Sequence, residues 1–256
     1  MRASIILCDM TTPELEPYPD LPPAIHLHPT APLAERVLLP GDPGRALRLA
    51  QALTDEPRMF NHNRGLWGYT GRSRIDGEPL TIQATGMGGP SAAIVVNELI
   101  DLGARRLLRI GTCGALHPAL ALGEIVIVTE ALCADGTSRA LGASSRAQAA
   151  RQLAERLRTA ADHGAAGPGP VTSGPVVSTD LFYDAEDQFA SWTEAGALAV
   201  EMEAAAVLTV ADRRGVHAGC ALAVSDLLIP THVRIETPLL TEAEQRLGTL
   251  ASAAFS

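Results

Sequence analysis

The chain has 256 residues, of which 46% are hydrophobic, and it carries a formal net charge of -9. This length and apolar content fit one large α/β domain, and the acidic balance argues against the basic face that a nucleic-acid or anionic-membrane surface requires. All twenty basic residues other than histidine are arginines, which excludes a Schiff-base lysine, a pyridoxal enzyme and a lysine-containing phosphate loop.

The predicted elements begin with a tail. Residues 1–23 are rich in proline and acid, so we expect an extended tail there, followed by a single domain at 24–256. Short β-rich runs then alternate with helical patterns. Strands are expected at 37–39, 80–82, 107–110, 124–128, 176–177 and 220–224, and helices after residue 42 and around 92–99, 153–161 and 204–211.

Glycines mark the predicted ends of three helices. Gly103, Gly164 and Gly215 each follow an apolar stripe of helical spacing, which is typical of a C′ residue, and Ser144 or Ser145 is expected to cap the start of the third helix. Alternation of strands and helices predicts an α/β fold with a mostly parallel or mixed sheet covered by helices. In such sheets, ligands bind at the carboxyl ends of the strands.

The cysteines indicate a reducing environment. Cys8, Cys113, Cys133 and Cys220 are widely spaced and form no CxxC motif, and three of them lie in segments that are expected to be interior. A cytoplasmic protein is the simplest interpretation. The apolar runs are also too short for a signal segment or a membrane span.

Glycine turns with arginines follow the predicted strands. Gly41 and Arg45 belong to a PGDPGR turn that opens a helix, where backbone N–H groups and the arginine would attract an anion. Arg109 lies inside an apolar strand and Thr112 in the turn after it, an arrangement that is hard to explain unless an anion meets the arginine. Arg64, in a loop, would by itself be typical of a solvated surface residue.

A further glycine-rich turn at 86–91 resembles a dinucleotide-binding fingerprint only weakly. Its sixth residue is Ser91, and no acidic residue ends a second βα unit at the required distance. Met87 in this turn could lie against a sugar, although a methionine beside glycines is also a common gap filler.

Three carboxylates interrupt apolar sequence. Glu201 and Glu203 flank Met202 ahead of an alanine- and valine-rich helix, and Asp226 follows Ser225 at the end of the apolar run 220–224. A buried ionised carboxylate costs several kcal/mol unless a partner or ligand compensates it. The structural alternative is a helix N-cap and one salt bridge; the functional one is an active site.

Seven motifs in order resemble one family. They are PGDPGR at 40–45, NRGLWGYTG at 63–71, TGMGGPS at 85–91, RIGTCGAL at 109–116, STDLFY at 178–183, VEMEAA at 200–205 and VSD at 224–226. Together they cover roughly residues 25–230 and are similar to the trimeric and hexameric purine nucleoside phosphorylases of the nucleoside phosphorylase superfamily. The resemblance implies a three-layer α/β sandwich with a twisted mixed central β-sheet flanked by helices.

The resemblance also implies an activity, which is phosphorolysis of purine (deoxy)ribonucleosides to the free base and (deoxy)ribose 1-phosphate in purine salvage. Inorganic phosphate would be the co-substrate, with no cofactor and no metal. The expected phosphate ligands are Gly41, Arg45, Arg64, Arg109 and Thr112. The expected nucleoside ligands are His26, Met87, Phe182, Glu201, Met202, Glu203 and Ser225.

Asp226 matches the family's general acid, which protonates N7 of the departing purine. Its apolar flanks would favour the protonated form. The family's further arginine beside this acid has no clean match, because Arg246 is offset by one position and Arg234 lies in a loop of unfamiliar sequence. Residues before Ala24 also fall outside the pattern.

The family's sites are completed by a neighbouring subunit. His26, with His28 as a rival, and Arg64 match the histidine and arginine that the neighbour contributes, so the resemblance implies a homo-oligomer, a hexamer built as a trimer of dimers. Uridine phosphorylase and methylthioadenosine phosphorylase are the nearest alternatives. A hydrolytic nucleosidase or a non-catalytic nucleoside-binding protein is further away, since water needs no three-arginine site and both Asp226 and Glu203 are present.

Overall fold

The computed structural model describes residues 24–183 and 185–256, so the expected tail at 1–23 lies outside the described residues and the proposed domain boundary stays a prediction. The strands are β1 (Arg36–Leu39), β2 (Thr54–Asn61), β3 (Gly68–Ser73), β4 (Pro79–Gln83), β5 (Arg106–Ala115), β6 (Ile125–Cys133), β7 (Arg146–Gln148), β8 (Val171–Ser178), β9 (Ala199–Glu201), β10 (His217–Leu227) and β11 (Val233–Arg234). The α-helices are α1 (Pro43–Leu53), α2 (Gly89–Asp101), α3 (Gly136–Ala140), α4 (Arg151–Asp162), α5 (Phe189–Glu194), α6 (Ala204–Arg213) and α7 (Thr237–Ala253), and short 3₁₀ turns are η1 (Asn63–Gly65) and η2 (Glu186–Gln188).

All the described strands belong to one mixed sheet. Its order is β11-β10-β6-β8-β9-β5-β1-β4-β3-β2, with β7 paired to β6, and β10 also pairs with β5. The pairs β1–β4, β1–β5, β5–β10, β6–β8 and β8–β9 are parallel, whereas β5–β9 and β6–β10 are antiparallel. Strand β5 therefore pairs with β10 along its whole length, with β1 in its first half and with β9 at its carboxyl end.

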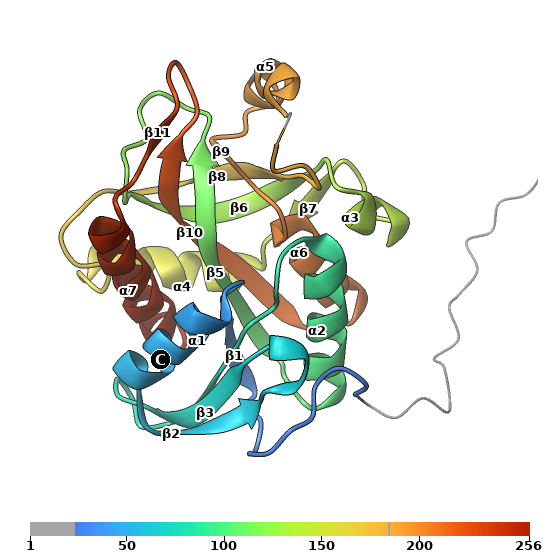
Figure 1. The fold of residues 1–256 in the computed structure, drawn as a ribbon, viewed down its shortest axis with the longest axis vertical. Helices are drawn as coiled ribbons and strands as arrows, with labels where there is room; N and C mark the ends of the chain where they lie inside the picture. Colours follow the sequence, from blue (N-terminus) through green and yellow to red (C-terminus); the bar gives the residue numbers. More distant parts are fainter. Residues whose placement is uncertain (1–23, 184) are drawn as a thin grey trace, which may run out of the picture.

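The central strands are mainly apolar because helices cover both faces of the sheet, and the buried Arg109 of β5 is an exception. Alternate residues of β5 and β6 point into different cores: Leu107 and Val126 pack with α2 and α6, while Leu108 and Ile127 pack with α1, α4 and α7. Figure 1 shows α1 and α7 on one side of β5 and α2 and α6 on the other. The predicted three-layer α/β sandwich with a mixed central sheet is confirmed.

The predicted helix ends are correct, and one predicted start is wrong. Gly103, Gly164 and Gly215 lie directly after the C-caps of α2, α4 and α6, and all three have positive φ, which costs glycine little. However, α4 starts after Ala150 and not at Ser144 or Ser145, because strand β7 comes between and pairs with β6. Among the described residues, none of the helices is long and apolar enough to cross a membrane.

Candidate active site

A buried ion-pair cluster lies beside the carboxyl-terminal half of β5. Arg109 points its guanidinium at two carboxylates, with Nε 2.9 Å from Oε2 of Glu201 and Nη2 in contact with Oε2 of Glu203. The three side chains are only 4%, 1% and 8% exposed, respectively. The arginine that the sequence made hard to explain is thus held by two acids that follow it by 92 and 94 positions along the chain.

The local sequence creates the space for this cluster. A Cβ at Gly111 would lie 2.8 Å from Nη2 of Arg109, so the glycine leaves room for the guanidinium to fold back beside its own strand. Glu201 also receives the backbone N–H groups of Glu203 and Ala204 at 2.9 Å and the hydroxyl of Ser178. Its carboxylate therefore caps the start of α6 while it pairs with Arg109.

Burial and charge act in opposite directions in this cluster. Burial alone would lower the pKa of Arg109, but attraction to Glu203 and Glu201 outweighs it and raises that pKa above its ordinary value. Burial raises the pKa of Glu203; Arg109 opposes this effect and repulsion from Glu201 adds to it. The net effect is a pKa of Glu203 above its ordinary value.

The glycine turn after β4 contacts the same cluster. The backbone N–H of Gly88 donates to Oε1 of Glu203 at 2.5 Å, which brings Met87 next to this carboxylate. Met87 is 87% exposed, so it is not a core gap filler. On the other side of the turn, the N–H of Gly86 donates to the carbonyl of Gly41 at 3.0 Å, so the turns after β1 and β4 lie together.

Asp226 lies near the end of β10, opposite Gly114 of β5. The register shifts between Val224 and Asp226, so Ser225 forms a bulge that re-aims the side chains at this edge. Ser225 donates its hydroxyl to Oδ2 of Asp226 at 2.7 Å, and Nε2 of His232 is 3.1 Å from Oδ1. Val200 of β9 pairs with the same Gly114, so the two acid sites flank one strand end.

The remaining arginines expected near this site have other partners. Arg45 pairs with Glu244 of α7 at 2.7 Å, and Arg48 pairs with the other oxygen of that carboxylate at 2.8 Å. The Nε atom of Arg45 is buried and has no hydrogen-bond partner, which leaves one donor for a ligand. Arg246 donates to the carbonyl oxygens of Ala166 and Gly123 and fixes those loops.

Asn63 connects the segments that carry His26 and Arg64. The Nδ1 atom of His26 is 2.6 Å from Oε1 of Glu98 on α2, and Asn63, next to Arg64 in η1, donates to the carbonyl of His26 at 2.9 Å. Burial would raise the pKa of Glu98, but the hydrogen bond with His26 and those from the N–H groups of residues 25–27 lower it. Arg64 is exposed and has a φ of 57°, uncommon for a residue other than glycine.

The other predicted residues are partly or fully open to solvent. Thr112 and Met202 are half-buried, and Phe182 is 66% exposed and meets Tyr183 edge to face, with ring centroids 5.0 Å apart. His28 is exposed, and its Nε2 donates to the carbonyl of Ile25 at 3.2 Å. The structure therefore gathers Arg109, Glu201, Glu203 and Met87 and places Asp226 and Ser225 across β5. Among the described residues, no hydrogen bond or ion pair joins His26, Arg64 or Phe182 to them.

Sequence reasoning missed several partners of these residues. Ser178 had a signal, since it lies in the STDLFY motif, and Glu98 is an acid that follows the apolar run 92–96 of its helix. Glu244 and His232 lie in segments for which no element was predicted, and nothing in the pattern pairs them with Arg45 or Asp226. Among the described residues, no group of three or more histidine, cysteine or acidic side chains is arranged to hold a metal ion.

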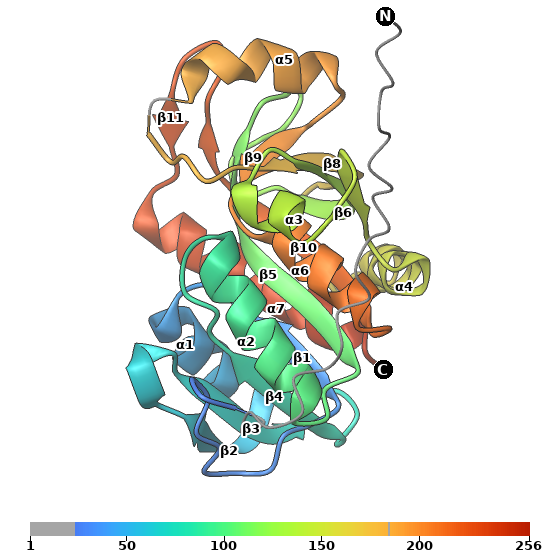
Figure 2. The same cartoon turned by 90° about the vertical axis from the view of Figure 1, so that its right-hand side faces the viewer.

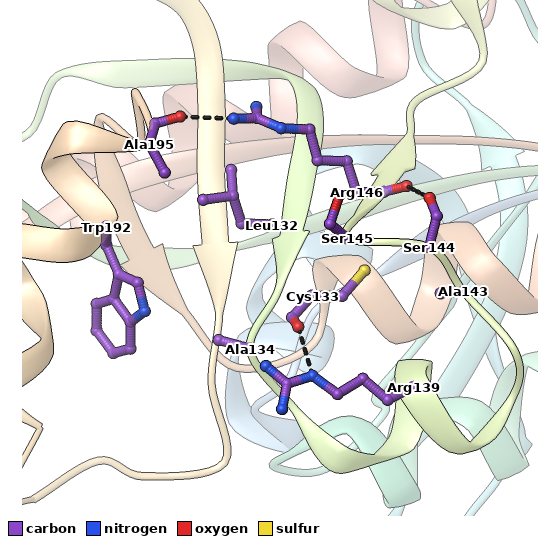
Figure 3. A pocket seen from close by; sticks show the side chains of 10 residues that line it. All are labelled: Leu132, Cys133, Ala134, Arg139, Ala143, Ser144, Ser145, Arg146, Trp192 and Ala195. Atoms are coloured by element: carbon purple, nitrogen blue, oxygen red, sulfur yellow. Dashed lines mark hydrogen bonds between the residues drawn. The ribbon is translucent and has the colours of Figure 1, made fainter.

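A cavity of about 710 Å³ is lined by other residues (Figure 3). It is lined by the end of β6, the segment between α3 and β7, and α5. Its arginines are bound to main chain: Arg139 donates to the carbonyl of Cys133 at 2.8 Å and Arg146 to that of Ala195 at 2.6 Å. None of the residues predicted to bind substrate lines this cavity.

Comparison with known proteins defines the class. The family model described as "Phosphorylase superfamily" matches residues 35–256, so the chain belongs to the phosphorylase superfamily. The predicted resemblance is confirmed.

Two curated relatives within the superfamily carry the same protein name. The chain is 38% identical over 201 residues to a protein named purine nucleoside phosphorylase DeoD-type from Geobacillus kaustophilus, covering 78% of this chain and 84% of the relative. It is also 38% identical over 219 residues to one of the same name from Caldanaerobacter subterraneus subsp. tengcongensis, covering 85% and 90%. Among solved structures, a uridine phosphorylase from Vibrio fischeri superposes with a TM-score of 0.78 at 27% identity, covering 87% of this chain and 91% of that one.

Proposed function

We propose that the chain cleaves purine (deoxy)ribonucleosides with inorganic phosphate, releasing the purine base and (deoxy)ribose 1-phosphate. The observation that carries this proposal is the buried Arg109 beside Glu203 at one flank of β5, with Asp226 at the other. The reaction needs three groups: a cationic hydrogen-bond donor for phosphate, a hydrogen-bond acceptor for the sugar hydroxyls, and an acid that faces the base. The names of the curated relatives support the same activity.

Phosphate binding falls to Arg109 and its neighbours. A guanidinium has five N–H donors, and two of those on Arg109 are used by Glu201 and Glu203, so three remain for an anion. Arg45 adds its unpartnered Nε. The backbone of Gly41, the hydroxyl of Thr112 and Arg64 from a neighbouring subunit complete the proposed set. Charge-assisted hydrogen bonds would hold the dianion as the attacking nucleophile.

Ribose recognition falls mainly to Glu203. Glu201 already accepts from four protein groups, whereas Glu203 accepts from the Gly88 N–H and from Arg109 and retains lone pairs for sugar hydroxyls. As the C–N bond breaks, positive charge develops on the sugar, and a carboxylate on its hydroxyls binds this transition state more strongly than the ground state. Met87 and Met202 would pack against the ring.

Asp226 is the proposed acid that assists departure of the base. The leaving purine is an anion unless N7 is protonated, and a carboxylic acid at Asp226 would donate that proton. The Ser225 hydroxyl fixes the orientation of the carboxyl group. Phe182, exposed in the present structure, would stack on the purine when the nucleoside binds.

We also propose that this chemistry needs no cofactor beyond phosphate and takes place in the cytoplasm. Every charge that develops in the reaction has a side chain to meet it within the proposed site. Cys113, Cys133 and Cys220 are buried free thiols, which supports a reducing compartment.

The proposed sites are shared between subunits. Asn63, next to Arg64, donates to the carbonyl of His26, so the two residues lie on connected segments that would enter a neighbour's site together. Isoleucine, methionine and tryptophan side chains are exposed in the same segments, at Ile25, Met59 and Trp67, as expected for a face that another copy covers. We propose a dimer that assembles three times into a hexamer.

A substrate panel tests the activity. Inosine, guanosine, adenosine, methylthioadenosine and uridine are incubated with and without phosphate, and free base is measured. Cleavage of a purine nucleoside that depends on phosphate is expected. Equal rates without phosphate would indicate a nucleosidase, and preference for uridine would indicate the activity named for the structural neighbour.

Asp226→Asn tests the general acid. It should lower kcat on inosine about 10²- to 10⁴-fold, the usual range for such a group, with far less effect on 7-methylguanosine, whose base departs without taking a proton. Equal losses on both substrates would mean that Asp226 only positions the base.

Subunit mixing tests the shared site. A His26→Ala, Arg64→Ala double variant and the Asp226→Asn variant, each shown to be a folded oligomer, are mixed and allowed to exchange subunits. Hybrid dimers then contain one site with only native residues, so activity should return up to the limit set by random pairing. A mixture that stays inactive after verified exchange would place both residues in their own chain's site or outside any site.

A further inference from the structure

Asp226 has a second side-chain partner that none of the recognised motifs contains. His232 lies six residues later, in the turn between β10 and β11, with Nε2 3.1 Å from Oδ1 of Asp226. The other oxygen, Oδ2, accepts the hydroxyl of Ser225 at 2.7 Å. The imidazole is 64% exposed and the carboxylate 14%, so His232 connects a partly buried acid to solvent.

The two arginines that could accompany Asp226 are placed differently. Arg246 is held by the carbonyl oxygens of Ala166 and Gly123, at 2.8 and 3.2 Å. Arg234 is paired with Asp226 across the antiparallel β10–β11 ladder, yet it is exposed and forms no ion pair with it among the described residues. The partner that contacts the carboxylate is therefore the histidine.

The other neighbours of Asp226 do not supply a proton. Ser225 is a neutral hydroxyl whose oxygen also lies 3.2 Å from the carbonyl of Cys113. Burial raises the pKa of the Cys113 thiol, and its proton stays in place across the physiological range. Gly114, opposite Asp226 on β5, has no side chain, and Arg234 on β11 is a permanent cation.

We propose that His232 acts through Asp226: it supplies the proton that Asp226 then donates to the purine. This inference rests on the phosphorolysis proposed above. Protonated His232 gives the proton on Nε2 to Oδ1, which leaves a neutral imidazole and a carboxylic acid. Asp226 then passes its proton to N7 as the C1′–N9 bond breaks and a phosphate oxygen bonds to C1′. Solvent reprotonates His232, and the esterified phosphate releases its own proton, so one proton is taken up and one is released.

The test compares His232→Ala and His232→Gln, with Arg234→Gln as the matched control. Glutamine keeps an N–H donor near the position of Nε2 but cannot carry a proton between solvent and Asp226. Each variant is assayed with phosphate on inosine and on 7-methylguanosine from pH 5.5 to pH 9, after its unfolding midpoint has been shown to match the wild type. His232 and Arg234 are both exposed, so neither change removes core packing.

His232→Ala should lower kcat on inosine about tenfold or more, with KM and the rate on 7-methylguanosine within about twofold, since only protonation of the base is affected. A proton donor works only when protonated, so the wild-type kcat on inosine should fall as pH rises. His232→Gln should lack the step in that profile, and Arg234→Gln should retain it.

Three results would overturn the proposal: equal losses on both substrates, an unchanged pH profile in His232→Gln, or a selective loss on inosine from Arg234→Gln. A wild-type protein that cleaves inosine with phosphate while both His232 variants match it refutes only this inference. A wild-type protein without phosphate-dependent cleavage refutes the proposed function and this inference with it.

Discussion

Replacing Arg109 with methionine should destabilise the protein strongly, because the change leaves Glu201 and Glu203 buried without their shared cation. The guanidinium makes a 2.9 Å hydrogen bond to Glu201 and a direct ion pair with Glu203, and both acids are less than a tenth exposed. Breaking a buried pair from one side costs about 3–5 kcal/mol. Set against a typical stability of about 5–15 kcal/mol, this is a large fraction.

The assay is urea unfolding at one fixed protomer concentration in phosphate-free buffer, because both ligand and assembly change the apparent stability. The control is the triple variant Arg109→Met, Glu201→Gln, Glu203→Gln, which removes the cation and both charges together. It should recover at least about 2 kcal/mol of the loss, since neutral polar groups replace unpaired buried charges.

Adding phosphate extends the same experiment to function. The wild type should gain stability in proportion to the logarithm of phosphate concentration above Kd, and Arg109→Met should gain little. A single variant as stable as the wild type, or a triple variant less stable than the single one, would refute the reasoning about charge. An equal phosphate response in both proteins would refute the assignment of Arg109 to the anion.

Three more predictions concern neighbouring residues. Gly111→Ala should lower the free energy of unfolding by about 1–3 kcal/mol and raise the phosphate KM. Its Cβ would lie 2.8 Å from Nη2 of Arg109, which the two acids hold in place, so an unchanged free energy of unfolding and an unchanged KM would contradict this prediction. Burial raises the pKa of Glu203, so the folded state keeps a proton that the unfolded state loses, and stability falls as pH rises above the ordinary glutamate range. Glu203→Gln should flatten this slope in unfolding midpoints measured from pH 4.5 to pH 8, and parallel slopes would argue against it. The hydrogen bonds from Arg36, at 2.5 and 2.6 Å, lower the pKa of Asp76. Asp76→Asn should therefore lower the free energy of unfolding by about 1.5–3 kcal/mol at neutral pH, and by progressively less as pH falls below the ordinary aspartate pKa. A difference in stability between variant and wild type that stays constant with pH would count against the pairing.

The sequence by itself determined the main framework of the fold. Strands covered on both faces need largely apolar runs, so β1, β5, β6 and β10 could be predicted from such runs, despite Arg109 in β5. The helix ends at Gly103, Gly164 and Gly215 followed from the need for positive φ. The ordered motifs also determined the family. These features depend on residues close together in the chain, and a local pattern is enough to reveal them.

Only the tertiary structure decided which groups meet. Strands β7, β9 and β11 have two or three residues each and exist through pairing, which no local pattern reveals, and β7 displaced the helix start predicted at Ser144 or Ser145. Arg45 forms an ion pair with Glu244, which follows it by 199 positions, and Arg109 donates a hydrogen bond to Glu201, which follows it by 92. His232 reaches Asp226 because a bulge and a tight turn bring two strand ends together. Ion pairs of this kind depend on distance in space, and the order of residues along the chain does not encode that distance locally.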